Sequence, residues 1–285
     1  MENVTIKLNG RAVSAPAGST ILEAAHLAGI KIPTLCFLKE INEIGACRIC
    51  VVEVKGAKTL VASCVHPISD GMEIWTNTPK VLEARRKTLQ LILSAHDRKC
   101  LSCVRSGNCE LQQLCRELGV AEEDYFDGEK NEYELDVTAA HMIRDNNKCI
   151  LCRRCSAVCE KVQGIGVIGP NHRGFATSIG SAFEMGLGDT SCVSCGQCIA
   201  VCPTGALQEK DYIDEVLEAM PIRKTCCSAD SAFRKSGIWE KSLDIRLELT
   251  WRERWWQHFE ESDLTKCLTR ISVQISLLWK KRMNL

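Results

Sequence analysis

Two cysteine clusters of identical spacing lie in the second half of the chain. Residues 149–159 read CILCRRCSAVC and residues 192–203 read CVSCGQCIAVCP, so the pattern C-x2-C-x2-C-x3-C occurs twice. This spacing binds paired 4Fe-4S clusters, in which three nearby thiolates hold one cluster and the fourth ligates the other. A pair of zinc sites would leave the fourth cysteine of each motif unexplained. We therefore predict one cluster on Cys149, Cys152, Cys155 and Cys202, and a second on Cys192, Cys195, Cys198 and Cys159.

A third group of cysteines lies near the N-terminus, on the edge loops of a predicted sheet. Cys36, Cys47, Cys50 and Cys64 follow C-x10-C-x2-C-x13-C, which differs from the C-x4-C-x2-C order of plant-type ferredoxins. The spacing alone indicates four thiolates on one metal site without naming the metal. The sheet context favours a 2Fe-2S cluster, with zinc or a pair of disulfides as the alternatives.

Between these groups, a helix end places His96 shortly before Cys100, and Cys103 and Cys109 follow. One imidazole with three thiolates is also a common zinc set. Beside three other cluster motifs, we expect a 4Fe-4S cluster with one His ligand. Neutral imidazole in place of thiolate lowers the negative charge at a cluster and so changes its reduction potential.

The elements that carry these residues are predicted from periodicity. Residues 4–13 alternate apolar and polar side chains about Asn9-Gly10, which indicates a tight hairpin. Thr20 and Glu23 form a capping-box pattern before a helix that Gly29 ends. Residues 50–64 predict a second hairpin that turns at Lys55-Gly56, and residues 72–77 predict one further strand. We therefore expect a small α+β sheet domain of about 75 residues.

Thr78-Pro79 opens a predicted helix that leads into His96, with residues 81, 82, 85, 89, 92 and 93 on one face. The acidic stretch 121–137 is expected to be a solvated connector. Residues 149–205 form an approximate internal repeat, with a Gly-rich loop between its halves. The glycines of that loop do not form a nucleotide-binding motif, so we expect no cofactor beyond the metal clusters.

Composition sets the context for these motifs. The chain has 285 residues, 19 of them Cys, and a formal net charge of zero. Neutrality gives no reason to expect nucleic acid as a partner. The N-terminus lacks a secretory signal pattern and no run of eighteen apolar residues occurs, so we expect a cytoplasmic chain with reduced, metal-bound thiols and no membrane insertion.

Some metal-binding residue types lack partners at ligand spacing. Cys115 is interpreted as a small apolar residue of a helix, and His26, His66, His141 and His172 as ordinary surface or core histidines.

The order of these sites resembles the N-terminal accessory region of multi-cluster iron-only (FeFe) hydrogenases, over residues 1 to about 219. The large subunit of NAD-dependent formate dehydrogenases shares it. The 75 kDa subunit of complex I resembles the first half but normally departs from the paired eight-cysteine pattern. The resemblance implies an α+β chain with a β-grasp 2Fe-2S ferredoxin domain (1–77), a small helical one-His, three-Cys cluster domain (78–118) and a bacterial-type two-cluster 4Fe-4S ferredoxin domain (138–219).

Residues 220–285 hold three Cys without ligand spacing, whereas the hydrogenases continue into a catalytic domain with its own cysteines. Residues 225–234 can be encoded so that a one-base shift reads LVVQQTAPS, which resembles the opening of that domain. The stretch from Ser262 can be encoded so that a two-base shift resembles a later part. We therefore predict an aberrant, frameshifted and poorly packed tail.

The function expected from these observations is electron transfer through one 2Fe-2S and three 4Fe-4S clusters to or from a hydrogenase catalytic domain. Without ligands for hydrogen chemistry, the chain is not expected to be catalytic alone. Its expected partners are a ferredoxin or an NAD(P)H-oxidising flavoprotein subunit. The alternatives are the electron-transfer part of a formate dehydrogenase or complex I-type NADH dehydrogenase, and a stand-alone polyferredoxin carrier.

Overall fold

The computed structural model of the chain describes residues 3–121 and 128–214. Residues 1–211 form one compact unit, whose interior holds three groups of buried apolar residues. The tail predicted from residue 220 lies outside the described residues. Every helix in the described part of the chain is too short or too polar to span a lipid bilayer.

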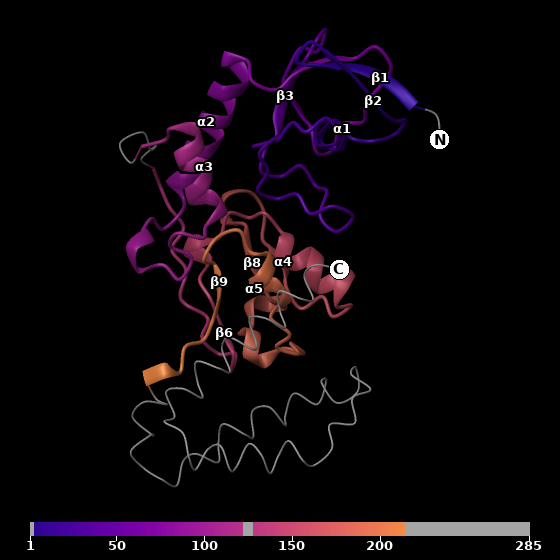
Figure 1. Cartoon of the computed structure of the whole chain (residues 1–285). Coiled ribbons are helices and arrows are strands. Elements are labelled where there is room, and N and C mark those ends of the chain that lie inside the picture. Colours follow the sequence, from indigo (N-terminus) through magenta and orange to yellow (C-terminus); the bar gives the residue numbers. More distant parts are fainter. Residues whose placement is uncertain (1–2, 122–127, 215–285) are drawn as a thin grey trace, which may run out of the picture. The chain divides into compact units, whose positions relative to one another are not determined.

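A mixed five-stranded sheet forms the N-terminal part, with strand order β2-β1-β5-β3-β4. Its strands are β1 (Asn3–Leu8), β2 (Arg11–Pro16), β3 (Val51–Val54), β4 (Val61–Ala62) and β5 (Glu73–Trp75). Both predicted hairpins are confirmed, because β1 pairs antiparallel with β2 and β3 with β4. The central pairing of β1 with β5 is parallel. Figure 1 shows helix α1 (Ile21–Leu27) beside this sheet, and its buried side chains join those of β1 and β5 in one apolar core.

The predicted capping box of α1 is confirmed. The backbone N–H of Glu23 donates to Thr20 Oγ1 at 3.2 Å, and the backbone N–H of Thr20 donates to Glu23 Oε2 at 2.9 Å. Gly29 follows the helix with a φ of 71°, a conformation that glycine adopts without steric cost. The helix end turns the chain toward the loop that carries Cys36.

Helices α2 (Pro79–Ser94) and α3 (Glu110–Leu118) pack side by side in the middle of the unit (Figure 1). Thr78 caps α2 and Pro79 is its first residue, as predicted. Four side chains at the expected spacing are buried, those of Val81, Arg85, Leu89 and Leu93. Leu82 was expected on the same face but is exposed, because a strict i, i+4 stripe is narrower than the predicted set.

The C-terminal part is built from short elements around two antiparallel strand pairs. Strand β6 (Met142–Arg144) pairs with β9 (Leu207–Glu209), and β7 (Gly169–Asn171) with β8 (Ser178–Gly180). Helix α4 (Arg154–Ala157) continues into a π-helical turn (Val158–Val162), and α5 (Gln197–Val201) occupies the matching place in the second half. Short 3₁₀ turns complete this part, at Cys100–Ser102, Asn146–Lys148, Gly174–Ala176, Ala182–Glu184 and Leu187–Asp189.

The acidic stretch after α3 differs in part from the expected solvated connector. Asp136 forms an ion pair of 2.9 Å with Arg144 Nη2, and the two residues also exchange backbone hydrogen bonds. Tyr133 binds the side chain of Asn147 through its backbone N–H and carbonyl. The expectation is therefore wrong for these two positions, because tertiary partners that local composition cannot reveal hold them in place.

One apolar core crosses the predicted boundary between the first two domains. Leu35, Cys36 and Ile49 pack in the same buried group as Leu89 of α2 and Cys152. Within the compact unit, the loop that carries the N-terminal cysteines therefore lies against the helices and the first paired motif.

An ion pair fastens α3 to α4. Arg154 is buried, and its Nη1 and Nη2 donate to Glu110 Oε1 and Oε2 at 2.7 and 2.9 Å. Arg154 Nε has no hydrogen-bond partner, so Glu110 supplies the negative charge that compensates this guanidinium. Such bidentate pairing is among the stronger charge-assisted interactions.

We predict that Glu110→Ala destabilises the cluster-loaded chain by about 2 kcal/mol, because it leaves a buried cation unpaired while Glu110 itself is half exposed. This corresponds to a thermal unfolding midpoint about 4–8 °C lower, measured by circular dichroism. The control is Glu117→Ala on the same helix, since Glu117 pairs with Lys31 at 3.6 Å on an exposed surface. Equal shifts in the two variants would contradict this assignment.

Candidate metal centres

The four N-terminal cysteines converge although up to 28 positions separate them in the sequence. Cys36, Cys47, Cys50 and Cys64 are all buried, and Cys50 Sγ lies 3.4 Å from Cys64 Sγ. The backbone N–H of Cys47 points at Cys36 Sγ, 3.5 Å away. They stand on the loop before β3 and directly after β4, so the β3–β4 pairing is what brings Cys50 to Cys64.

These thiols titrate as two pairs. A hydrogen bond with Cys36 lowers the pKa of Cys47 to about 6, and one with Cys64 lowers the pKa of Cys50 to about 6. The same hydrogen bonds, with burial, raise the pKa of Cys36 and of Cys64. Within each pair, the hydrogen bond thus favours the thiolate form of one cysteine and the thiol form of the other. Thiolate is the form that binds metal.

A buried cation lies beside this site. Arg85 of α2 is 3% exposed, and its Nη2 donates to the carbonyl of Val51 at 2.8 Å, next to Cys50. Its Nε has no hydrogen-bond partner. Burial lowers the pKa of Arg85, and the Cys50 thiolate opposes that shift. An anionic group held by the four thiolates would compensate this guanidinium, which is otherwise costly to bury.

The two paired motifs form two cavities, and each cavity takes cysteines from both motifs. Cys149, Cys152, Cys155 and Cys202 line the first, together with apolar side chains such as Ile168 and Ile179. The second is lined by Cys159, Cys192, Cys195 and Cys198. This grouping is the crossed arrangement that the sequence spacing predicts. Within the described part of the chain, no three His, Cys, Asp or Glu side chains close round a point as they would for a single ion.

The internal repeat extends to strained backbone positions. Leu151 and Arg153 in the first motif have φ values of 54° and 60°, and Ser194 and Gly196 in the second have 53° and 73°. A non-glycine residue in this region costs about 1–3 kcal/mol. The backbone N–H of the left-handed Leu151 points at Cys149 Sγ at 3.4 Å. Successive N–H groups of this kind form anion-binding concavities at Fe-S sites.

Burial raises the pKa of four thiols that line the two cavities. It raises the pKa of Cys149 to about 12, of Cys152 to about 11 and of Cys198 to about 12. Burial also raises the pKa of Cys155. These four metal-free thiols are therefore protonated at neutral pH, so metal binding to them must release protons.

His96 is buried at the end of α2, and its Nδ1 has no hydrogen-bond partner. Burial lowers its pKa, while Asp97 and a hydrogen bond with the backbone of Lys148 oppose that shift. The ring is thus neutral, with one free nitrogen and a backbone contact that fixes its orientation. Neutral imidazole oriented in this way is typical of metal-ligating histidine.

Of the other three predicted ligands of this site, two lie at the start and end of a short 3₁₀ turn and the third directly precedes α3. Cys100 is exposed at the start of the turn, and Cys103 and Cys109 are half buried. Cys103 lies against Gly205, where an added Cβ would stand 2.7 Å from its Sγ. Cys109 Sγ lies 3.6 Å from the carbonyl oxygen of Pro203. The segment after Cys202 therefore contacts two predicted ligands of a different site.

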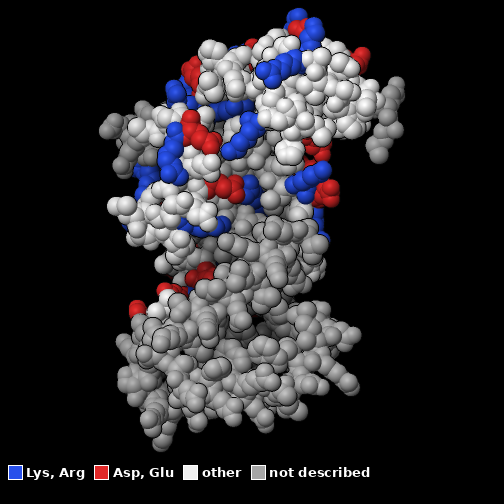
Figure 2. Space-filling model, in the orientation of Figure 1, with Lys and Arg blue, Asp and Glu red and all other residues white. Residues whose placement is uncertain are grey.

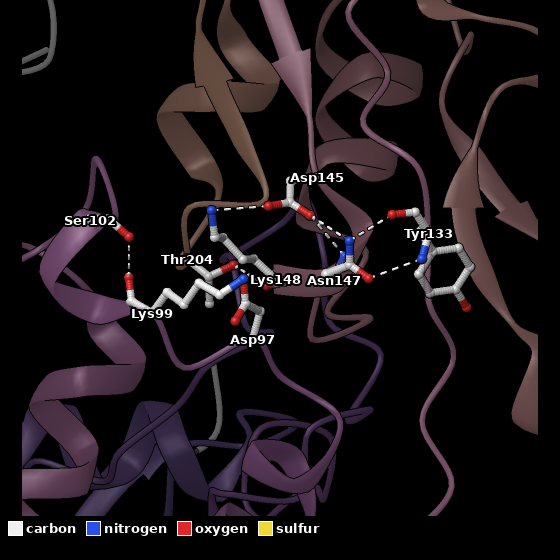
Figure 3. Close-up of polar contacts among 8 residues, drawn as sticks. All are labelled: Asp97, Lys99, Ser102, Tyr133, Asp145, Asn147, Lys148 and Thr204. Carbon is white, nitrogen blue, oxygen red and sulfur yellow. Dashed lines mark hydrogen bonds and ion pairs between the residues drawn. The ribbon is translucent and has the colours of Figure 1, made fainter.

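A polar network connects these segments (Figure 3). Lys148 Nζ pairs with Asp145 at 2.9 Å, and the carbonyl of Lys148 accepts from Thr204 Oγ1 at 2.8 Å. The backbone N–H of Asp97 donates to the carbonyl of Asn147 at 2.8 Å. Burial alone would lower the pKa of Lys148, but its hydrogen bond with Asp145 raises it above the usual value. This network fixes the loop after His96 to the turn before Cys149.

Cys115 lies on α3 as predicted, but it is only half buried. Burial and the nearby Cys109 and Cys100 raise its pKa to about 11. Among the four histidines interpreted as ordinary, His26, His141 and His172 are exposed and His66 is partly so. His172 Nε2 lies 2.7 Å from Glu184.

Sequence reasoning missed the residues that join the sites. Four such residues lie outside every ligand pattern, namely Asn42, Arg85 with its buried charge, Lys148 and Gly205. The one available signal is the position of Arg85 on the apolar face of a predicted helix. Figure 2 shows basic and acidic side chains interspersed over the described part of one face, which fits the zero net charge.

The donor sets fit the proposed groups. Four soft thiols around a mostly apolar cavity are ligands that iron–sulfur clusters select. The site of His96 adds a buried imidazole nitrogen, Nδ1, which has no hydrogen-bond partner and could bind a metal.

Three family profiles match the chain. Residues 1–79 match a 2Fe-2S iron-sulfur cluster binding domain, residues 85–124 the NADH-ubiquinone oxidoreductase-G iron-sulfur binding region, and residues 142–206 a 4Fe-4S dicluster domain. The chain thus contains one 2Fe-2S domain and further 4Fe-4S-binding domains.

Individual proteins show the same relationship. The NADP-reducing hydrogenase subunit HndD of Solidesulfovibrio fructosivorans is 49% identical over 77% of this chain and 38% of its own length. The G 2 subunit of NADH-quinone oxidoreductase from Rhizobium meliloti is 36% identical over 73% of this chain and 24% of its own. The chain therefore spans less than half the length of these relatives.

A solved structure supports the fold of the same region. A chain of an NAD+-reducing [NiFe]-hydrogenase in the H2-reduced state superposes with a TM-score of 0.68 at 31% identity, covering 73% of this chain and 87% of that one. Residues 1–206 therefore belong to the family of iron–sulfur domains that NADP-reducing hydrogenases share with the G-type subunits of NADH-quinone oxidoreductases.

Proposed function

We propose that this chain carries electrons through one 2Fe-2S and three 4Fe-4S clusters. In this assignment the first part is a β-grasp domain (1–77), followed by a His-ligated cluster domain (78–118) and a bacterial-type two-cluster domain (138–219). The proposed ligands are Cys36, Cys47, Cys50 and Cys64; His96, Cys100, Cys103 and Cys109; Cys149, Cys152, Cys155 and Cys202; and Cys159, Cys192, Cys195 and Cys198. Bound clusters supply one-electron centres whose potentials the protein sets through charge, hydrogen bonds and exposure.

The observation that carries this proposal is the crossed grouping of the paired cysteines. Each cavity holds three thiols of one motif and the fourth of the other. Two pairs of thiols would suffice for zinc in each motif and would not require this exchange. The crossed set is the arrangement expected for two neighbouring 4Fe-4S clusters.

The site of Cys149, Cys152, Cys155 and Cys202 is the junction of the proposed route. The backbone N–H of Glu110, next to Cys109, donates to the carbonyl of Pro203, next to Cys202, at 3.2 Å. This links the His96 site to the junction. On another side, Cys152 shares a buried core with Cys36 and Cys47. The cavity that contains Cys159 completes the route, because Cys155 and Cys159 lie on one continuous helical turn.

The similarity favours a hydrogenase as the host of this module. Identity is 49% to the NADP-reducing hydrogenase subunit but 36% to the NADH-quinone oxidoreductase subunit. We therefore propose that the module serves a catalytic domain of the iron-only type and exchanges electrons with a ferredoxin or an NAD(P)H-oxidising flavoprotein subunit. A complex I-type dehydrogenase is the second candidate, favoured by the match of residues 85–124 to the oxidoreductase-G region.

We predict about fourteen iron atoms per reconstituted chain, measured by iron analysis and electron paramagnetic resonance (EPR). Iron below about ten would contradict the four-cluster assignment.

Because the fourth ligands cross, Cys202→Ser should remove the signal of the cluster on Cys149 and retain that on Cys192. Cys159→Ser should do the reverse, and Cys115→Ser should retain every signal. The opposite pattern for the first two variants would show uncrossed sites.

His96→Cys should lower the midpoint potential of the third 4Fe-4S cluster and leave the other three unchanged. The reason is that thiolate adds a negative charge where neutral imidazole stood, and charge at the ligands sets the potential. An EPR-monitored redox titration measures the shift. The matched control is His141→Cys, at an exposed position. Unchanged midpoints in both variants would exclude His96 as a ligand.

Gly205→Ala should selectively disturb the same cluster, since the new Cβ would lie 2.7 Å from Cys103 Sγ and force it to turn away. We expect a loss of up to about four iron atoms per chain, with the other three EPR signals retained. Gly169→Ala is the control, because its Cβ would meet no atom within 4 Å. Full retention of iron in Gly205→Ala would show that Cys103 is not held there as a ligand.

A further inference from the structure

Asn42 touches two proposed cluster sites at once. Its side chain is nearly inaccessible, since the residue is 2% exposed. Asn42 Nδ2 donates to the carbonyl of Cys36 at 2.7 Å and to the carbonyl of Cys152 at 3.0 Å. The two acceptors lie more than a hundred positions apart in the sequence, and each belongs to a proposed ligand of a different cluster. Both N–H groups of one carboxamide are thus used to join the two sites.

The position of Asn42 is fixed by a short loop. Its backbone N–H donates to the carbonyl of Leu38 at 2.8 Å, and the N–H of Leu38 donates back to the carbonyl of Asn42 at 3.1 Å. Lys161 Nζ donates to the carbonyl of Ile41 at 2.7 Å, so the loop is also tied to the helical turn after Cys159. The contact of Lys161 is exposed and involves no carbonyl of a proposed ligand. A Lys161 variant therefore serves as a control for loosening the loop without changing either ligand carbonyl.

The side chain of Asn42 lies in buried, apolar surroundings. Cys36, Cys47 and Cys152 pack in one buried apolar group. In such surroundings, leaving a carbonyl without a hydrogen-bond donor costs about 1–3 kcal/mol of stability. The negative end of its dipole also acts more strongly on nearby charges than it would in water. The two carbonyls therefore present their dipoles to the clusters unless the carboxamide N–H groups offset them.

We propose that Asn42 is a positioning residue for electron transfer, which couples the 2Fe-2S centre to the junction cluster and tunes the potentials of both. The inference rests on the proposed function. With clusters bound at both sites, a single electron would pass from one to the other, and no atom or proton would need to move. Asn42 would connect the two sites through the hydrogen bonds that its Nδ2 donates to the carbonyls of Cys36 and Cys152. Hydrogen bonds and local charge around the ligands are what set cluster potentials.

The test uses the full chain with all clusters loaded. Asn42→Leu keeps the approximate size and removes both donors, Asn42→Asp keeps the shape and adds an acceptor, and Lys161→Gln changes the neighbouring exposed tether. EPR-monitored titrations give the four midpoint potentials. Rapid mixing with a limiting reductant, followed by freeze-quenching, gives the rate at which the electron passes from the 2Fe-2S centre to the junction cluster.

In Asn42→Leu we expect both midpoints of the coupled pair to become more negative, because two bare carbonyl dipoles stabilise the oxidised clusters. The other two midpoints stay unchanged and the transfer rate falls several-fold. Asn42→Asp should shift the pair further in the same direction, and Lys161→Gln should alter neither quantity.

Three outcomes would overturn the proposal. The first is a lower unfolding temperature in the Asn42 variants with unchanged midpoints and rate, which would leave Asn42 a purely structural tether. The second is the same shift in Lys161→Gln. The third is loss of clusters from both Asn42 variants, which would make Asn42 a residue of assembly. Failure of the proposed function would be recognised separately, by missing clusters in the unaltered chain.

Discussion

The two proposed clusters of the paired motifs each take ligands from segments far apart in the chain, and the architecture follows from this requirement. Neither paired motif can enclose its own cavity, because the fourth thiol of each lies in the other. The strand pair of β6 with β9 and the two short helices α4 and α5 place these segments together. Because the elements are short and the aromatic content is 5%, the free energy of metal binding must supply a large part of the folding free energy.

Burying anionic groups has costs that the surrounding residues offset. Left-handed backbone at Leu151, Arg153 and Ser194 stores strain, and at Leu151 the backbone N–H points at Cys149 Sγ. Arg85 remains buried without a carboxylate partner beside the N-terminal site. The high pKa values of the buried thiols have the same origin, since an apolar cavity disfavours thiolate until a metal is bound.

Three of the proposed sites meet around one region of backbone. The turn before Cys149 is held by Lys148, Asp145 and Asn147 (Figure 3), and the segment after Cys202 contacts Cys103 and Cys109. The carbonyl of Cys152 accepts from Asn42 on another side. These contacts are polar and short, whereas the apolar core around them is shared between the sequence-defined domains. A junction built in this way can keep the distances between redox centres constant while the outer surface varies.

Most of the local structure could be predicted from the sequence, for reasons that lie in short-range physics. The hairpin at Asn9-Gly10, the capping box of Thr20 and Glu23, and the start of α2 at Thr78-Pro79 each depend on neighbours within four residues. The grouping of Cys202 with Cys149 also followed from spacing, because two identical motifs in series leave the x3 cysteines no other use. Predictions failed where a distant partner decides, as at Asp136, which Arg144 holds by an ion pair.

The proposed ligands could be chosen from the sequence alone, since the spacing of the cysteines and of His96 is itself the pattern that predicts a cluster site. How the sites are joined was decided by tertiary packing. Nothing in the chemistry of Asn42, Lys148 or Gly205 marks them as special, and each gains its role from an atom that lies 56 to 110 positions away in the sequence. Spacing along a chain encodes a ligand set, but the contact between two ligand sets depends on the packing of whole segments.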